Sequence, residues 1–125
     1  MIYLDTHIVV WLYNCEISRF SKKTLEVIEK NDLFICPATV LELQYLREIN
    51  RIKTDALLII NSLKASIGLQ ISNVSFEDVV NVSLLQTWTR DPFDRMIVGA
   101  ASVGNDILIT KDSQILKNYH NAYWK

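Results

Sequence analysis

The chain has 125 residues, half of them hydrophobic, with 13 basic and 14 acidic side chains and a formal net charge of −1. This length and composition predict a single domain over residues 1–125, with enough apolar surface to form a core without disulfides. The charge balance excludes a protein that coats nucleic acid by electrostatics alone, because such proteins are strongly basic.

Cellular location is indicated by the missing targeting features and by the cysteines. No apolar run approaches the ~18 residues of a membrane-spanning helix, and no basic segment precedes a long apolar stretch as in a secretory signal. Cys15 and Cys36 form no CxxC motif and have no histidine at zinc-ligand spacing. We therefore expect two reduced thiols in or near the core, and a soluble, cytoplasmic protein without membrane contact.

Short apolar segments alternate with amphipathic segments along the whole chain. Residues 7–13 fit either a strand or a helix by periodicity, and their position after a strand ending in Asp5-Thr6 favours a helix. In chain order, the pattern predicts strands over residues 1–5, 33–36, 69–74, 106–110 and 122–124, and helices over residues 7–13, 18–30, 39–50, 54–66, 75–87, 91–104 and 114–117. Apolar strands that alternate with helices are typical of a parallel sheet covered on both faces, so we expect an α/β fold.

Several helix ends carry recognisable capping residues. Gly68 is expected as a left-handed C-cap after the helix over 54–66. Ser75 and Asp78 stand in capping-box register, and Asp91-Pro92 combines an N-cap with proline at the first helical position. Gly99 is a poor helix former inside the helix over 91–104.

Four carboxylates occur at positions where a metal site would need them. Asp5 ends the first strand, Asp94 lies in the first turn of its helix, and Asp112 follows the strand over 106–110. Glu42 lies on an otherwise apolar helix face. In an open α/β sheet such positions converge at one edge, and anions gathered there repel unless a divalent cation neutralises them. Oxygen ligands without histidine suit Mg²⁺ or Mn²⁺, and His7 and His120 are read as isolated, non-metal residues.

Each acid also has an ordinary structural interpretation. Asp5 and Asp112 suit turn or N-cap positions, and Asp91 is interpreted as an N-cap rather than as a site residue. Glu42 stands three residues after Thr39, so the two form a capping-box pattern in which Thr39 is the expected partner of Glu42. Taken singly these signals are weak, but their order and local contexts together favour the metal site.

Four segments of the chain resemble the PIN-domain proteins of the VapC toxin type: residues 3–7, 38–43, 90–97 and 109–112. The resemblance covers essentially the whole chain, and Asp91-Pro92-Phe93-Asp94-Arg95 is its most specific part. It implies a three-layer α/β/α sandwich with a mostly parallel sheet. It also implies an endoribonuclease that depends on Mg²⁺ or Mn²⁺, a small antitoxin partner and a homodimer. The acids implied as metal-binding and catalytic are Asp5, Glu42, Asp94 and Asp112.

Substrate phosphate would need cations or hydroxyls beside those acids. The neighbouring residues expected to contact RNA are Arg95, Lys111, Thr6 and Thr110, with Arg47, Arg90, Arg51 and Lys53 as further cations and Trp11, Tyr13, Tyr45 and Trp88 as rings on which bases could stack. Other functions stay open: a PIN protein in RNA processing, a catalytically silent module that binds RNA or a protein, and a phosphatase or DNA nuclease on a related fold.

Overall fold

A central parallel sheet organises the molecule. The computed structural model describes residues 1–125. Its five strands have the order β3-β2-β1-β4-β5, and every neighbouring pair is parallel. Their bounds are β1 Ile2–Leu4, β2 Leu33–Ile35, β3 Gln70–Ile71, β4 Ile107–Ile109 and β5 Ala122–Tyr123. The predicted α/β class is confirmed, and β5 is an edge strand.

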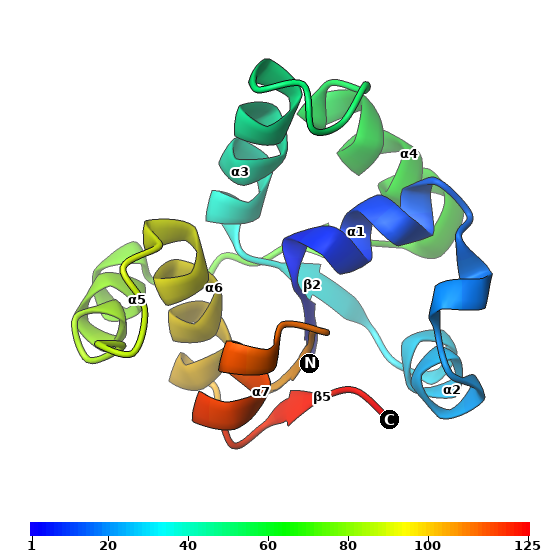
Figure 1. The fold of residues 1–125 in the computed structure, drawn as a ribbon. Coiled ribbons are helices and arrows are strands. Elements are labelled where there is room, and N and C mark those ends of the chain that lie inside the picture. The colour runs from blue at the N-terminus through cyan, green and yellow to red at the C-terminus, as the bar shows by residue number, and fades with distance from the viewer.

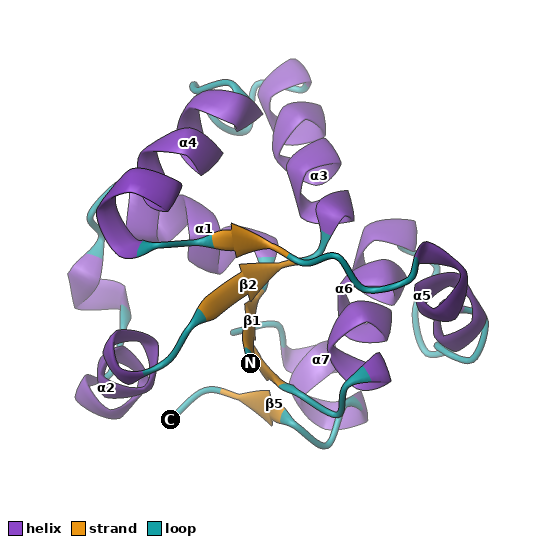
Figure 2. Cartoon of the chain, turned by 180° about the vertical axis from the view of Figure 1, so that it is seen from behind, coloured by secondary structure: helices purple, strands orange, loops and turns teal.

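Helices cover both faces of this sheet, as Figures 1 and 2 show from opposite sides. They are α1 Thr6–Tyr13, α2 Lys22–Lys30, α3 Pro37–Glu48, α4 Ala56–Ile67, α5 Phe76–Ser83, α6 Pro92–Val103 and α7 Ser113–Asn118. The helices α1, α2 and α4 lie on one face, and α6 and α7 on the other, with α5 packed against the outside of α6. The arrangement is the expected three-layer α/β/α sandwich. None of these helices is both long and apolar enough to cross a bilayer.

Two hydrophobic cores lie on the two faces of the sheet. Ile2 and Leu4 belong to the core under α1 and α4, whereas Tyr3 between them belongs to the core under α6 and α7. Successive strand residues point to opposite faces, so a strand buried on both sides reads as a continuous apolar run. Because β2, β1 and β4 are parallel, their C-terminal ends lie at a common edge, where the next residues leave the sheet.

Several element boundaries differ from the sequence expectation. The helix predicted from residue 18 begins at Lys22, because Ser21 caps it by accepting a hydrogen bond from the Thr24 amide (3.1 Å), and Ile17–Arg19 form a separate 3₁₀ turn. The strand predicted over 69–74 is reduced to β3, and the helix predicted to reach residue 87 ends at Ser83.

The largest correction concerns α3. It begins at Pro37 with Cys36 as its N-cap residue, two residues earlier than predicted, because proline is well suited to the first helical turn. Thr39 is therefore fully buried inside the helix and does not cap it, so the predicted Thr39–Glu42 capping box is wrong.

Two glycines have conformations or contacts that other residues would disturb, and the two cysteines differ in burial. Gly68 adopts the predicted left-handed conformation at the end of α4, with φ of 69°. Gly99 is needed for close helix packing, because a Cβ there would lie 2.8 Å from Ser83 Oγ and 2.9 Å from the Val79 carbonyl oxygen on α5. Cys36 is buried as expected, but Cys15 is exposed in a turn with φ of 56°, so the expectation of a core or near-core thiol is wrong there.

Candidate metal centre

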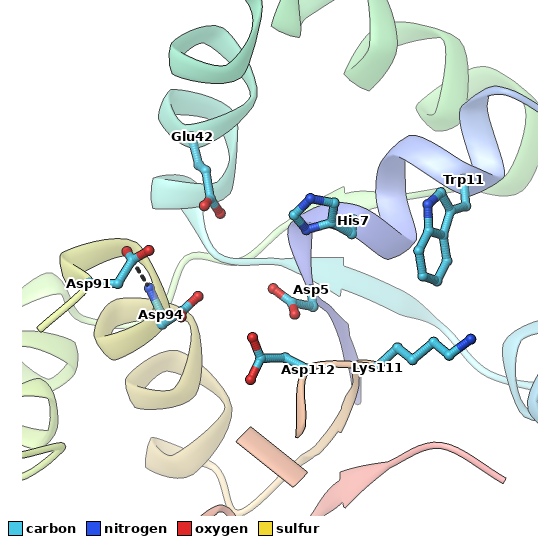
Figure 3. Close-up of a pocket in the computed structure, with 8 residues that line it drawn as sticks. All are labelled: Asp5, His7, Trp11, Glu42, Asp91, Asp94, Lys111 and Asp112. Atoms are coloured by element: carbon cyan, nitrogen blue, oxygen red, sulfur yellow. Dashed lines mark hydrogen bonds between the residues drawn. The ribbon is translucent and has the colours of Figure 1, made fainter. Parts of the chain in front are cut away.

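A cavity of about 350 Å³ opens at the sheet edge where β1 and β4 end and where α6 begins. We call it the acid pocket. Its wall is formed by Asp5, His7, Trp11, Glu42, Asp91, Asp94, Lys111 and Asp112 (Figure 3). The fold therefore brings all four predicted acids to one pocket and adds a fifth, Asp91.

Asp5 is fixed at the end of β1 by two hydrogen bonds. It is the N-cap of α1, and its Oδ1 accepts from the Thr6 amide at 2.8 Å. Its Oδ2 accepts from the Thr110 hydroxyl at 2.7 Å. Burial raises the pKa of Asp5, and the hydrogen bonds from Thr110 and Thr6 oppose that rise. The structural and functional interpretations of Asp5 thus hold together, since one side chain caps a helix and lines the pocket.

Glu42 reaches the pocket from α3 and is 9% exposed. Its partner is the Thr6 hydroxyl, which donates to Oε1, and not Thr39, whose own hydroxyl has no partner. Burial, together with the charges of Asp5 and Asp91, raises the pKa of Glu42 to about 7. Near neutral pH without a cation a substantial fraction of this carboxyl group is therefore protonated, and a bound cation would favour its ionised form.

Asp91 and Asp94 enter from the first turn of α6. Asp91 is the predicted N-cap, and its Oδ1 accepts from the amides of Phe93 (2.8 Å) and Asp94 (3.2 Å). Burial and then the charge of Asp91 raise the pKa of Asp94 to about 7, with smaller contributions from the other acids of the pocket. Carboxylate oxygens of Glu42, Asp91 and Asp94 lie within 4.8 Å of one another.

Asp91 was not expected in the site because the Asp-Pro pair already accounted for it as a helix cap. The overlooked signal is its spacing from Asp94. Residues three apart at a helix start lie on the same side, so two acids in that register approach one ligand together.

Asp112 faces the acid pocket beside Asp5, with its carboxyl group turned toward Asp94 (Figure 3). It follows β4 and caps α7, and its Oδ1 accepts from the amides of Gln114 (2.9 Å) and Ile115 (3.0 Å). Its own amide donates to the Thr110 hydroxyl at 3.0 Å, so Thr110 supports both Asp5 and Asp112. Asp112 is exposed, which leaves its second carboxylate oxygen accessible from the pocket.

The residues expected to contact substrate are placed differently from one another. Lys111 lines the acid pocket, with Nζ 5.5 Å from the centre of the Trp124 ring. Arg95 does not line it, because its Nε donates to the Thr89 carbonyl at 2.9 Å. Thr6 and Thr110 are fully buried beneath the acids, where they hold carboxylates. His7 is an unexpected wall residue, although its position two residues after Asp5 was a usable signal.

The donor set fits a hard divalent cation. Five carboxylates, one lysine, one histidine and one tryptophan line the acid pocket, no cysteine is among them, and the closely grouped ligand atoms are all carboxylate oxygens. The raised pKa values of Glu42 and Asp94 arise from burial and mutual repulsion, which a bound cation would offset. Carboxylate oxygens are the ligands that Mg²⁺ and Mn²⁺ prefer. Glu42, Asp91 and Asp94 are the most closely grouped, with Asp5 and Asp112 opposite.

Comparison with known proteins agrees with this architecture. The fold is similar to a chain of a toxin–antitoxin complex from Klebsiella pneumoniae, with a TM-score of 0.66 and 16% identity over 98% of this chain and 96% of that one. It is also similar to a chain of VapBC2 from Rickettsia felis bound to a DNA fragment from their promoter, with a TM-score of 0.65 and 21% identity over 100% of both chains. No protein with a curated description matches the sequence. The family model of the PIN domain matches residues 2–121, so the predicted resemblance is confirmed and the chain belongs to the PIN-domain family.

Proposed function

We propose that the protein is a Mg²⁺- or Mn²⁺-dependent endoribonuclease that hydrolyses RNA phosphodiester bonds. The observation that carries this proposal is the convergence of five carboxylates on one pocket, three of them with oxygens within 4.8 Å of one another. Such a group of anions is costly to assemble without a cation. Membership of the PIN-domain family supports nuclease chemistry, and the resemblance to VapC-type proteins supports RNA as the substrate.

In this proposal the acids divide two tasks, holding the ion and orienting the attacking water. A divalent ion held by the acids would lower the pKa of a water molecule and stabilise the charge that develops on phosphate. Asp5, Asp94 and Asp112 would hold the ion, with Asp91 beside Asp94 in the closest group of carboxylates, and Thr110 keeps Asp5 in the required orientation. Thr6 occupies Oε1 of Glu42, which leaves Oε2 to orient the attacking water. Lys111 is the cation on the pocket wall, and its side chain, which extends away from the acids (Figure 3), would turn toward them to bind the substrate phosphate.

The biological setting we propose is a toxin–antitoxin pair in the cytoplasm. Both similar solved structures carry that description: one is a toxin–antitoxin complex and the other is VapBC2 with promoter DNA. This chain would then be the toxin, bound by a small antitoxin and assembled as a homodimer. The exposed apolar side chains Leu41, Leu57, Leu58, Phe76 and Leu85 leave surface for protein contacts.

The test is cleavage of a labelled single-stranded RNA pool in Mg²⁺, in Mn²⁺ and in EDTA. Wild type is compared with Asp94→Asn, which is nearly isosteric and removes one charge. Asp32→Asn is the matched control, because Asp32 is exposed and lies outside the acid pocket. We expect metal-dependent cutting by wild type and by Asp32→Asn, and a loss of at least about a hundredfold in Asp94→Asn.

A labelled DNA pool and a small aryl phosphate ester are included as rival substrates. Equal RNA cleavage by wild type and Asp94→Asn, or cleavage that persists in EDTA, would contradict the proposal. Faster metal-dependent hydrolysis of DNA or of the ester than of RNA would assign the same site to a different substrate class.

A further inference from the structure

A second cavity, of about 420 Å³, adjoins the acid pocket. His7 and Trp11, one turn apart on α1, line both cavities and form their common wall. We call the second cavity the flanking pocket. Its cationic side is the turn between α3 and α4, which contributes Arg51 and Lys53.

The flanking pocket has the opposite electrostatic character from the acid pocket. Arg51 and Lys53 are exposed, and neither forms a salt bridge. The one acid on the wall, Glu16, accepts a hydrogen bond from Arg19 Nε at 3.0 Å, so its charge is already compensated. The two cations are therefore available to a ligand.

The turn that carries these cations has a defined backbone. The Arg51 amide donates to the Leu46 carbonyl at 2.8 Å, and Asn50 before it adopts φ of 62°. The nearby Arg47 belongs to the scaffold, because its Nε lies 3.4 Å from Asp55 Oδ1. The backbone of the turn therefore places two cationic side chains at one end of the pocket, where their charge would attract an anion.

A ligand that spans both cavities must tolerate two opposite environments. At the acid pocket the ligand must bind beside a divalent cation, and at the flanking pocket it must carry negative charge. An RNA strand meets both conditions, because every nucleotide supplies a phosphate. An acidic peptide also supplies negative charge, but the phosphodiester that the proposed function places in the acid pocket belongs to a strand that can continue into the flanking pocket. Trp11 and Tyr13 add ring surface against which a base can pack.

We propose that the flanking pocket binds the RNA strand on one side of the cleaved bond, with Arg51 and Lys53 contacting phosphates and Trp11 and Tyr13 contacting a base. This inference rests on the proposed nuclease function and adds a substrate path to it. The RNA strand would run from the acid pocket over α1 to the turn between α3 and α4. RNA that extends into this pocket binds more tightly than RNA that occupies the acid pocket alone.

The test uses the double variant Arg51→Gln/Lys53→Gln. Its matched control is Lys30→Gln/Lys117→Gln, which removes the same charge from exposed lysines outside both cavities. Binding of a fluorescent single-stranded RNA of about 16 nucleotides is measured by anisotropy, with Asp94→Asn in every protein to prevent cutting. Cleavage of the same RNA and of a dinucleotide is measured with Asp94 intact.

We expect the flanking-pocket variant to bind the long RNA about tenfold more weakly than its parent, with the control within about twofold. Each phosphate contact on a single strand contributes about 0.7 to the slope of log affinity against log salt, so the slope should fall by about 1.4. The kcat/KM should fall more for the long RNA than for the dinucleotide. Equal losses in the variant and the control, or no loss in either, would overturn the proposal.

Two further outcomes separate the proposals from one another. If wild type binds RNA through the flanking pocket but does not cut it, the RNA path stands and the nuclease function fails. A fluorescent polyglutamate peptide is titrated in parallel. Tighter binding of this peptide than of RNA, lost in the flanking-pocket variant, would assign the pocket to an acidic protein segment and overturn the RNA path.

Discussion

Thr110 at the end of β4 holds Asp5 at the end of β1 through a hydrogen bond of 2.7 Å, although the two residues are 105 positions apart in sequence. The bond exists because β1 and β4 are neighbouring parallel strands in register, with Leu4 opposite Ile109. Both partners are buried, so the carboxylate has few other orientations. The pairing of two strands thereby determines the position of one acid in the candidate metal centre.

Replacing Thr110 by valine tests this support. The substitution keeps the shape but removes the hydroxyl that serves Asp5 and the Asp112 amide. We expect Mg²⁺ affinity to fall about tenfold or more, and the free energy of unfolding to fall by about 1–3 kcal/mol. Calorimetric titration and thermal unfolding measure the two quantities. Thr110→Ser keeps the hydroxyl and should retain metal affinity, and wild-type affinity in the valine variant would contradict this role.

The two roles of Asp91 can be separated by substitution. Asparagine caps a helix as well as aspartate does but carries no charge. Asp91→Asn should therefore retain thermal stability and lose metal affinity if Asp91 binds the ion together with Glu42 and Asp94. Asp91→Ala should lose both, with about 1 kcal/mol of stability from the missing cap. Unchanged Mg²⁺ affinity in Asp91→Asn would show that this residue is a cap alone.

Stability of the metal-free protein should depend on pH in an unusual direction. Glu42 and Asp94 have pKa values of about 7, above their ordinary values of 4.5 and 3.8. Between those limits the folded chain keeps protons that the unfolded chain has lost, so the free energy of unfolding falls as pH rises through this window and levels off above about 7. Urea unfolding at several pH values in EDTA measures it.

Two comparisons sharpen the pH experiment. Glu42→Gln removes one of the titrating groups and should flatten the decline. Mg²⁺ binds ionised carboxylates, so it should raise the melting temperature more at about pH 8 than at about pH 5. Stability that increases with pH over this window in EDTA would contradict the raised pKa values.

Gly99→Ala tests the contact between α5 and α6. Alanine gains about 1 kcal/mol of helix propensity, but a Cβ 2.9 Å from the Val79 carbonyl oxygen would force the helices apart, at about 1–3 kcal/mol. We expect a net loss of about 1 kcal/mol in thermal or urea unfolding. Ser102→Ala in the same helix reports propensity without the clash and should be neutral or slightly stabilising. Equal stability changes in the two variants would rule out the close contact.

The parts of this fold that sequence predicts well are local. The apolar runs of β1 and β4 and the acids that follow them identify both strands and their C-terminal edge, because a buried parallel strand has a simple pattern. The cap at Asp91 and the C-cap at Gly68 were equally readable, since their residue types match the backbone that they stabilise.

The parts that sequence does not give depend on how distant elements meet. Glu42 and Thr39 lie one helical turn apart, so a local partner was the natural assignment, yet the approach of α1 to α3 supplies Thr6 instead. Arg95 adjoins Asp94 in sequence but turns to the Thr89 carbonyl. Adjacency in sequence determines where the backbone of a residue lies, whereas the direction of its side chain depends on the residues packed around it.

Asp5, Asp91 and Asp112 cap α1, α6 and α7 while lining the acid pocket. Asparagine can take over each cap, and aspartate and asparagine codons differ by a single base. A point mutation can therefore remove a charge from the centre while the helix keeps its start. Helix starts and pocket charge are thus carried by the same three side chains but can be lost separately, so normal folding of a variant says nothing of whether its pocket still holds all five charges.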